Sequence, residues 1–224
     1  MQRLLLALTA LLAIACDTST DGANGNVTFT PTDCGRIGCD FDNSIGVGGV
    51  IEVQITGLEG VSTAGADLVS DDPELLSVRA IADRGQPTWE LQALAAGVAR
   101  LTVLDAQGSD LDFLEVPMQE LTGLIGTNIL GNAVGPADDA SYDEVWTVNA
   151  DEAVSFQVTP VIGIDAPTMG KYVYTATIDA RLEAGLIETD LSGGYLYFEV
   201  PAGEYTASFV DDYGHFFDML IIAE

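Results

Sequence analysis

Three cysteines and one histidine are the side chains of this chain best suited to covalent or metal chemistry: Cys16, Cys34, Cys39 and His215. A zinc site needs about four nitrogen or sulfur ligands. Redox pairs favour Cys-x-x-Cys, which the interval from Cys34 to Cys39 is not. Because three is an odd number, an exported protein with this sequence would leave one thiol unpaired. One of the three cysteines must therefore have a role of its own.

Cys16 ends a segment with the composition of an export signal. Arg3 supplies a short positive region, and residues 4–14 form a nearly unbroken apolar run. This run is too short to cross a bilayer core of about 30 Å as a helix, which takes about 20 residues. The small residues 13–15 directly precede Cys16 and also fit ordinary secretion with cleavage at an Ala-x-Ala site. The residues by themselves leave both kinds of export open.

Residues 1–16 resemble the lipobox signal peptide of bacterial lipoproteins, in which a small-residue tripeptide precedes an invariant cysteine. Ala13 stands where leucine is usual, and Leu12 lies beside it. The resemblance implies that residues 1–15 are removed, that the Cys16 thiol is joined to diacylglycerol, and that the new amino terminus is acylated, as with palmitate. It implies a lipoprotein held by its N-terminal lipid to a bacterial membrane, at the cell surface of the outer membrane or on a periplasmic face.

With Cys16 lipidated, Cys34 and Cys39 remain as a pair. Two glycines between them, Gly35 and Gly38, let a short loop turn back on itself. A disulfide there suits an oxidising compartment and closes a very small loop, which the chain-entropy model values at roughly 2 kcal/mol. The sequence predicts a structural bridge between these two cysteines.

The charge of the chain is strongly acidic: 35 Asp and Glu against 7 Lys and Arg give a formal net charge of -28. The acids are scattered, which is typical of a solvated surface rather than of an acidic tail. Nucleic-acid binding needs basic residues to neutralise phosphates, and Lys171 is the single lysine. No nucleic-acid partner is therefore expected, and membrane attachment must come from lipid, with more than one acyl chain for stable anchoring.

The other candidate chemistry gives no catalytic residue. His215 lies among acids, but no Gly-x-Ser-x-Gly elbow presents a nucleophile to it, so a hairpin-loop histidine is the preferred interpretation. Asp110 and Asp112 share a predicted strand face, whereas a glycosidase needs two carboxyls across a cleft. Among 35 acids such pairs arise by chance. The sequence predicts a protein that is not an enzyme.

Calcium is the better chemical alternative, because oxygen ligands are abundant. The candidates are three aspartate pairs in predicted turns: Asp71, Asp72, Asp138, Asp139, Asp211 and Asp212. Their spacing matches no calcium loop, and Asp favours turns through its own hydrogen bonds, so no metal site is assigned. Trp146, Tyr195 and Tyr197 are candidates for a sugar or protein contact, against the more ordinary reading as core or cross-strand residues.

The elements that must position these residues follow a period of two. Residues 16–44 are interpreted as a flexible acidic linker. From residue 45 onward, short alternating segments are separated by turns, as in an antiparallel sandwich. The inward faces are expected to carry Ile51, Val53, Ile55, Leu76, Val78, Ala80, Trp89, Leu91, Ala93, Ala99, Leu101 and Val103.

Ser70–Val78 followed by Trp89–Val103 resembles a bacterial immunoglobulin-like domain of the invasin/intimin type. Such domains typically carry an S-x-D-P-x-x-x-x-V turn and an A-x-x-G-x-A-x-[IL]-x-V strand, and this chain has Leu94 at the first alanine of the second motif. The match covers residues 45–118. It implies an immunoglobulin-like fold and a surface or periplasmic setting, and it carries over no active site.

Residues 119–224 contain about seven more alternating segments, the count of a second such sandwich. Residues 121–135 are expected as an edge strand or the first strand of this unit, and 179–186 as a helical turn or loop. Pro201–Tyr205 resembles a tyrosine corner, and the same run is similar to strands of transthyretin-like modules. The expected fold class is all-β, with two immunoglobulin-like antiparallel β-sandwich domains.

The sequence thus predicts a non-catalytic, lipid-anchored cell-envelope protein that serves as a structural or adhesion module. Its expected partner is a protein or a glycan at the envelope. The alternative is an envelope module that binds calcium or carbohydrate.

Overall fold

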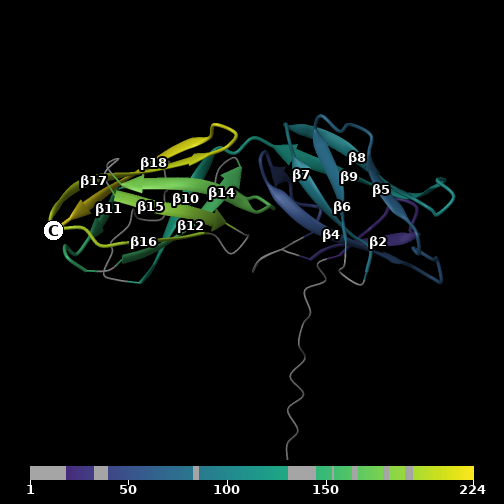
Figure 1. The fold of residues 1–224 in the computed structure, drawn as a ribbon, viewed down its shortest axis with the longest axis horizontal. Helices are drawn as coiled ribbons and strands as arrows, with labels where there is room; N and C mark the ends of the chain where they lie inside the picture. Colours follow the sequence, from purple (N-terminus) through teal and green to yellow (C-terminus); the bar gives the residue numbers. More distant parts are fainter. Residues whose placement is uncertain are drawn as a thin grey trace, which may run out of the picture.

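The computed structural model describes residues 19–32, 40–82, 86–130, 145–152, 154–162, 166–178, 182–189 and 194–224. Within these ranges the chain forms eighteen strands in four sheets (Figure 1). None of the described residues belongs to a helix that could span a membrane. Two sandwiches lie end to end along the long axis, with the C-terminus at the far end of the second (Figure 1). The predicted all-β fold is confirmed.

The first sandwich consists of nine strands. They are β1 Thr20–Asp21, β2 Val27–Pro31, β3 Ile45–Gly46, β4 Val50–Gly57, β5 Asp67–Ser70, β6 Leu76–Ile81, β7 Thr88–Ala93, β8 Gly97–Leu104 and β9 Asp110–Gln119. One sheet has the order β1-β2-β4-β7-β6 and the other β3-β9-β8-β5. Only β3 runs parallel to its neighbour, β9. With β2, β4, β7 and β6 as A, B, E and D, and β5, β8 and β9 as C, F and G, this is the immunoglobulin strand order.

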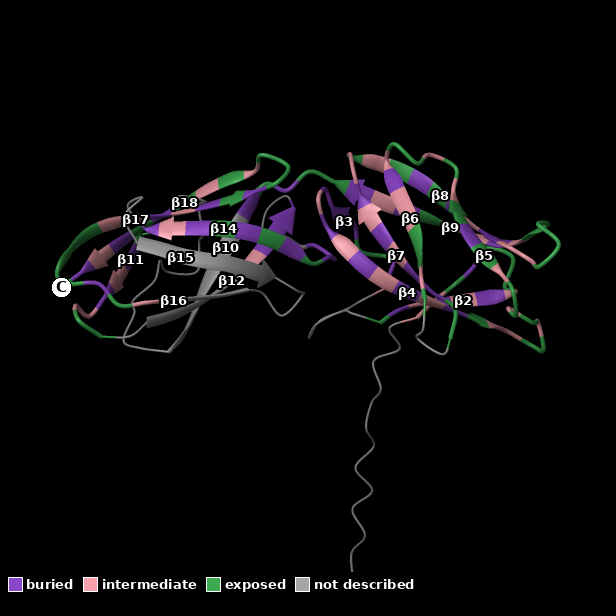
Figure 2. Cartoon of the chain, viewed as in Figure 1, coloured by how far each residue is buried: buried purple, intermediate pink, exposed green. Residues whose placement is uncertain are grey.

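The core of the first sandwich follows the predicted alternation. Of the twelve residues expected on inward faces, ten are buried, including Leu91, Leu101 and Val103 at 0% exposure. Figure 2 shows buried positions alternating with partly buried ones along β4, and with partly buried or exposed ones along β8. Strand β6 departs from the pattern, because Val78 is only partly buried and Ala80 is exposed. The alternation of apolar and polar residues predicts this core because each sheet has one face packed on the core and one face in contact with solvent.

The interpretation of residues 16–44 as a flexible linker is wrong for the part that the structure describes. Its described part supplies β1 and β2 to the first sandwich, where β2 pairs antiparallel with β4. Val27 and Phe29 are fully buried, and Phe41 packs against Phe29 edge to face. The polar, small-residue composition around residue 22 is that of the tight turn between β1 and β2, not of a flexible spacer. Composition alone does not separate a turn from a linker, because both favour the same residues.

The second sandwich also has nine strands. They are β10 Gly123–Leu130, β11 Val145–Val148, β12 Val154–Ile162, β13 Ala166–Pro167, β14 Tyr172–Ile178, β15 Leu182–Thr189, β16 Gly194–Phe198, β17 Gly203–Asp211 and β18 Phe216–Ala223. One sheet joins β12 to β10, β13 and β16, and the other has the order β11-β18-β17-β14-β15. Strand β10 is the predicted first strand of this unit. Strand β15 corrects the expectation of a helical turn or loop at 179–186, of which residues 179–181 lie outside the described ranges.

The predicted tyrosine corner is confirmed. The Tyr205 hydroxyl donates to the Pro201 carbonyl oxygen at 2.9 Å, four residues upstream and just before β17. Beyond it, Ala207 and Phe209 of β17 face Met219 and Ile221 of β18 in the second core. The bond ties the chain entering β17 to the strand itself, which is the role of this motif in immunoglobulin-like sandwiches.

One core residue comes from the other sandwich. Met169 lies between β13 and β14 of the second sandwich, yet its side chain is buried in the first hydrophobic cluster at 1% exposure. The first sandwich therefore completes its core only with residues contributed from beyond residue 118.

We expect Met169→Ala to destabilise the first sandwich by about 2 to 5 kcal/mol, because truncating a buried methionine removes apolar contacts and leaves a cavity. The chain has two tryptophans, one in each sandwich, so Trp89 fluorescence in a Trp146→Phe background reports the first and the reciprocal variant the second. Met219→Ala is the matched control within the second core. It should affect the Trp146 transition most, whereas an unchanged Trp89 transition in Met169→Ala would contradict the shared core.

Candidate functional site

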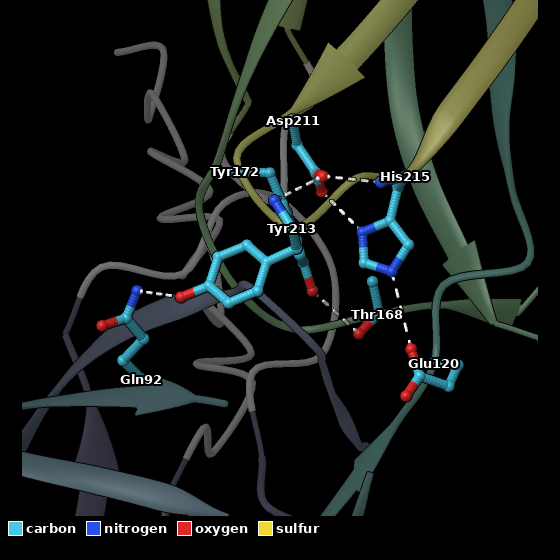
Figure 3. A network of polar contacts seen from close by, with 7 residues as sticks. All are labelled: Gln92, Glu120, Thr168, Tyr172, Asp211, Tyr213 and His215. Carbon is cyan, nitrogen blue, oxygen red and sulfur yellow. Dashed lines mark hydrogen bonds and ion pairs between the residues drawn. The ribbon is translucent and has the colours of Figure 1, made fainter. Parts of the chain in front are cut away.

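The described polar side chains gather most densely where the two sandwiches meet. We call this region the joint: residues 44–50 and Gln92 of the first sandwich, residues 168–172 and 211–215 of the second, and Glu120 between them (Figure 3). It contains the single histidine, the single lysine and a small pocket. The joint is therefore the place to look for function.

Backbone hydrogen bonds connect the two sandwiches directly. Val50 and Lys171 form an antiparallel bridge, with each amide donating to the other's carbonyl at 3.0 and 2.8 Å. The Met169 amide donates to the Ser44 carbonyl at 3.0 Å, and the Thr168 hydroxyl donates to the same carbonyl at 3.0 Å. The two sandwiches are therefore connected by backbone hydrogen bonds of the kind that join neighbouring strands, in addition to the chain that runs between them.

The turn between β17 and β18 is shaped by one buried carboxylate. The Asp211 side chain is 4% exposed and accepts from the amides of Tyr213 and His215 at 2.9 and 2.8 Å. Its second oxygen lies 2.6 Å from Nδ1 of His215. This arrangement satisfies a buried charge with several donors, and it fixes the orientation of both the tyrosine and the histidine that follow.

Tyr213 reaches from this turn to the first sandwich. Its hydroxyl accepts a 2.7 Å hydrogen bond from the side-chain amide of Gln92, 121 positions away in sequence. Its ring lies against Gly48, where an added Cβ would sit 2.7 Å from Cδ2 of the ring. Gly48 also has φ of 86°, so the position needs glycine for both backbone conformation and space.

His215 connects the same turn to the segment between the sandwiches. Its Nε2 lies 3.5 Å from a carboxylate oxygen of Glu120, opposite the Nδ1 contact with Asp211 (Figure 3). Both ring nitrogens thus face acids, and neither is placed to activate a hydroxyl nucleophile in the described structure. The hairpin-loop position predicted for His215 is confirmed.

Two tyrosines close the joint from within the second sandwich. Tyr172 donates from its hydroxyl to the Met169 carbonyl at 2.9 Å, and its ring stacks near that of Tyr174. Burial raises the pKa of both phenols well above the ordinary value. They are therefore neutral groups that pack, rather than ionisable groups poised for proton transfer.

A pocket of about 120 Å³ opens beside these contacts. Its lining combines aliphatic, aromatic and charged side chains: Gly48, Val50, Gln92, Lys171, Tyr172, Val173, Asp211, Asp212 and Tyr213. The carboxylate of Asp211 and the amide of Gln92 are already used within the joint. The wall that remains is largely apolar, which suits an inserted apolar group better than a strongly polar ligand.

Both carboxylates of the first aspartate pair accept backbone hydrogen bonds within the first sandwich. The Asp71 carboxylate accepts from the Arg100 amide at 2.7 Å, and the Asp72 carboxylate accepts from the Glu74 amide at 3.2 Å. Of the two pairs that the structure describes, Asp211 and Asp212 lie at the joint, and the third pair, Asp138 and Asp139, lies outside the described residues. No three His, Cys, Asp or Glu side chains in the described part of the chain are placed to hold a metal ion together.

Asp110 and Asp112 occupy different environments on β9. Asp110 is exposed, whereas Asp112 is 1% exposed and accepts four backbone hydrogen bonds of 2.7 to 3.1 Å. The donors are the amides of Asn24, Asn26, Val27 and Phe113. Asp112 thereby ties the turn between β1 and β2 onto the opposite sheet. The two carboxyls are not a catalytic pair.

Several predicted residues fall elsewhere. Cys16, Cys34 and Cys39 lie outside the described residues, so lipid attachment and the disulfide stay predictions. Trp146 is 6% exposed and belongs to the second core, which favours its structural interpretation over a sugar contact. The side chains of Tyr195 and Tyr197 are likewise outside the described part.

Sequence reasoning missed most of the joint. Gln92, Glu120 and Tyr213 carry no motif, and their partners are distant in sequence. The available signal was the glycine cluster ahead of β4, since Gly48 is required by the approach of Tyr213. A glycine needed for close approach indicates that something packs there, but not what.

No protein-family model matches the sequence, and no curated protein matches it. Among solved structures, it is similar to fibronectin(III)-like modules of Clostridium thermocellum CbhA, at 12% identity over 88% of this chain and 94% of that one, with a TM-score of 0.28. The Yersinia pseudotuberculosis adhesin InvE is similar at 16% identity over 91% of this chain and 61% of that one, with a TM-score of 0.33. Domains 4 and 5 of the S-layer protein SbsC are similar at 14% identity over 91% and 99%, with a TM-score of 0.30. Identities and TM-scores at this level assign the chain to no family and carry no ligand or partner over to it.

We expect Asp112→Asn to lower the free energy of unfolding by about 3 kcal/mol near neutral pH, because an amide cannot accept from all four backbone donors. Desolvation by burial favours the protonated acid, but the four donors together hold the pKa of Asp112 below its ordinary value of 3.8. The ionised form therefore adds stability above about pH 4, and this contribution is lost as the pH falls through the folded-state pKa.

Urea unfolding of both proteins between neutral and acid pH measures this difference, which should narrow below about pH 4. Asp110→Asn, two residues away and exposed, is the control and should change stability by no more than about 0.5 kcal/mol. A difference that stays constant through the acid range would contradict the role given to the Asp112 carboxylate.

A second test concerns the close approach of Tyr213. Gly60 has the same φ of 86° as Gly48, but nothing lies within 4 Å of an added Cβ. Gly60→Ala therefore measures backbone strain alone, about 1 to 2 kcal/mol. Gly48→Ala should destabilise the chain by at least about 1 kcal/mol more, because the tyrosine ring must move. Equal effects in thermal unfolding, with an unchanged NMR shift of the Gln92 side-chain amide, would contradict tight packing at the joint.

Proposed function

We propose that this chain is a non-catalytic, lipid-anchored module of the bacterial cell envelope, which presents two rigidly joined sandwiches to a partner. The observation that carries the proposal is the joint itself. Backbone pairing between Val50 and Lys171, together with Met169 in the first core, fixes the orientation of one sandwich to the other. A fixed orientation gives a stiff spacer that holds its far end at a set distance from its anchor.

The polar groups that most resemble catalytic machinery support the non-catalytic part of this proposal. Both ring nitrogens of His215 face carboxylates, and Asp112 is committed to four backbone donors. Tyr172 and Tyr174 are buried and stay neutral. Each of these groups holds the fold in place, so none is free to bind and turn over a substrate.

The proposed anchor is the lipid on Cys16, reached through the lipobox resemblance of residues 1–16. The proposed bridge between Cys34 and Cys39 would staple the segment that follows β2 before the chain enters β3. Since the acidic surface repels anionic headgroups, the lipid is the means of membrane attachment.

Membrane fractionation and mass spectrometry of the mature N-terminal peptide, with Cys16→Ala compared to the wild type, test this function. We expect the wild type to stay with the membrane fraction and its mature N-terminal peptide to carry the mass of diacylglycerol and a further acyl chain. The Cys16→Ala protein should lose both properties, whereas Cys39→Ala, the control for loss of a thiol, should keep them. Membrane retention of Cys16→Ala equal to the wild type would refute the lipid anchor.

A further inference from the structure

Exposed apolar side chains concentrate on one sheet of the second sandwich. The large hydrophobic residues with high exposure in the described chain are Val69, Val98, Val145, Val173, Val210, Tyr213, Phe216 and Leu220. All but Val69 and Val98 belong to the sheet of β11, β18, β17 and β14 or to the β17–β18 turn. A monomeric protein rarely leaves a contiguous apolar surface without a use for it.

Several of these exposed apolar side chains lie in the half of this sheet nearest the joint, beside the pocket. Val210 of β17 is paired directly with Phe216 of β18, and on its other side with Thr175 of β14. Val173, two positions before Thr175 and on the same outer face, also lines the pocket together with Tyr213. We call Val173, Val210, Tyr213 and Phe216, with the pocket, the docking face.

The pocket is sized for one side chain. Its volume of about 120 Å³ is slightly below the roughly 150 Å³ that encloses a benzene-sized group. Protein interfaces are typically held by a few apolar anchors that fill such pockets, surrounded by contacts that exclude water. An aliphatic side chain set into the pocket would place its flanking residues over the docking face.

The charge around the docking face selects the partner. Lys171 lines the pocket together with Asp211 and Asp212, and Asp218 lies on the same outer face of the sheet, where it accepts from the Ser208 hydroxyl. Lys171 and Arg181 are the only Lys or Arg residues from position 119 onward. Electrostatic complementarity therefore favours a basic partner, and a second copy of a chain with net charge -28 would be repelled.

A glycan fits this surface less well. Sugar recognition needs several convergent polar groups, but the Gln92 amide donates to Tyr213 and the Asp211 carboxylate is held by three donors of its own turn. Val173 and Val210 offer aliphatic contact and no hydrogen bonds. The observations therefore favour a protein.

We propose that the docking face binds a basic protein segment that inserts one aliphatic side chain into the pocket at the joint. The proposal rests on the proposed interaction function and gives it a surface and a class of partner. Binding at the joint would contact both sandwiches at once, through Gln92 on one side and β17–β18 on the other. A partner bound there would therefore recognise the relative orientation of the two sandwiches, which neither sandwich presents alone.

The test is selection of a phage-displayed random dodecapeptide library on the full mature chain in detergent micelles. We expect enriched peptides to combine Lys or Arg with an aliphatic residue, and their affinity to fall as salt is raised. Phe216→Ser should weaken their binding at least about tenfold, as expected for loss of an interface anchor. Val98→Ser is the control, since Val98 at 60% exposure matches Phe216 at 58% and lies on the first sandwich.

Four results would overturn the proposal: no enrichment, enriched peptides of acidic character, peptides that bind Phe216→Ser as well as the wild type, or a dimer in light scattering that Phe216→Ser dissolves. Shifts of the Tyr213 resonances with cellohexaose, at matched concentration and without peptide binding, would assign the face to a glycan instead. Unfolding of the variants is followed through both tryptophans. If Phe216→Ser fails to fold, Val210→Thr is the second variant that tests the same docking face. Lipid anchoring is measured in a separate experiment. A failure of the lipid anchor in the Cys16→Ala test therefore leaves the peptide-binding result valid, and a failure of peptide binding leaves the lipid anchor valid.

Discussion

The backbone pairing of Val50 with Lys171 is the contact on which the arrangement of the whole molecule depends. It places the residue before β14 against the first residue of β4, and the nearby Met169 side chain is buried in the first core. Once that side chain is buried, separating the sandwiches would expose both an apolar side chain and unpaired amides. The backbone bridge and the Met169 side chain therefore both connect the two sandwiches in the arrangement seen in this structure.

Buried carboxylates complete this arrangement. Asp211 shapes the β17–β18 turn so that Tyr213 and His215 reach across the joint, and Asp112 holds the β1–β2 turn against the opposite sheet. A charge removed from water must be compensated by several donors, so each of these acids organises the backbone around it. In a chain with so many acids, the ones that matter are distinguished by burial, which their local sequence does not report.

Much of the fold could be read in advance from alternation. Ile51, Leu91, Leu101 and Tyr174 all face inward as the period of two requires, and the tyrosine corner at Tyr205 was visible in its local motif. The errors have local causes as well. The β1–β2 segment shares its polar composition with linkers, and β15 carries a weak pattern that also suits a helical turn. In both places the decisive partner strand is remote, so a local window holds too little information.

Four features could be predicted from the amino-acid sequence alone: the class of fold, the acidic surface, the absence of a recognisable catalytic motif and the resemblance of residues 1–16 to a lipoprotein signal. These follow from composition, from periodicity along single strands and from motifs of adjacent residues. The joint, by contrast, is visible only in the folded chain. There Thr168 bonds to Ser44 and Tyr213 bonds to Gln92, although the partners are 124 and 121 residues apart in sequence. The physical reason is that a strand's pattern records which of its faces is buried, while the partner that buries it depends on how distant segments come together.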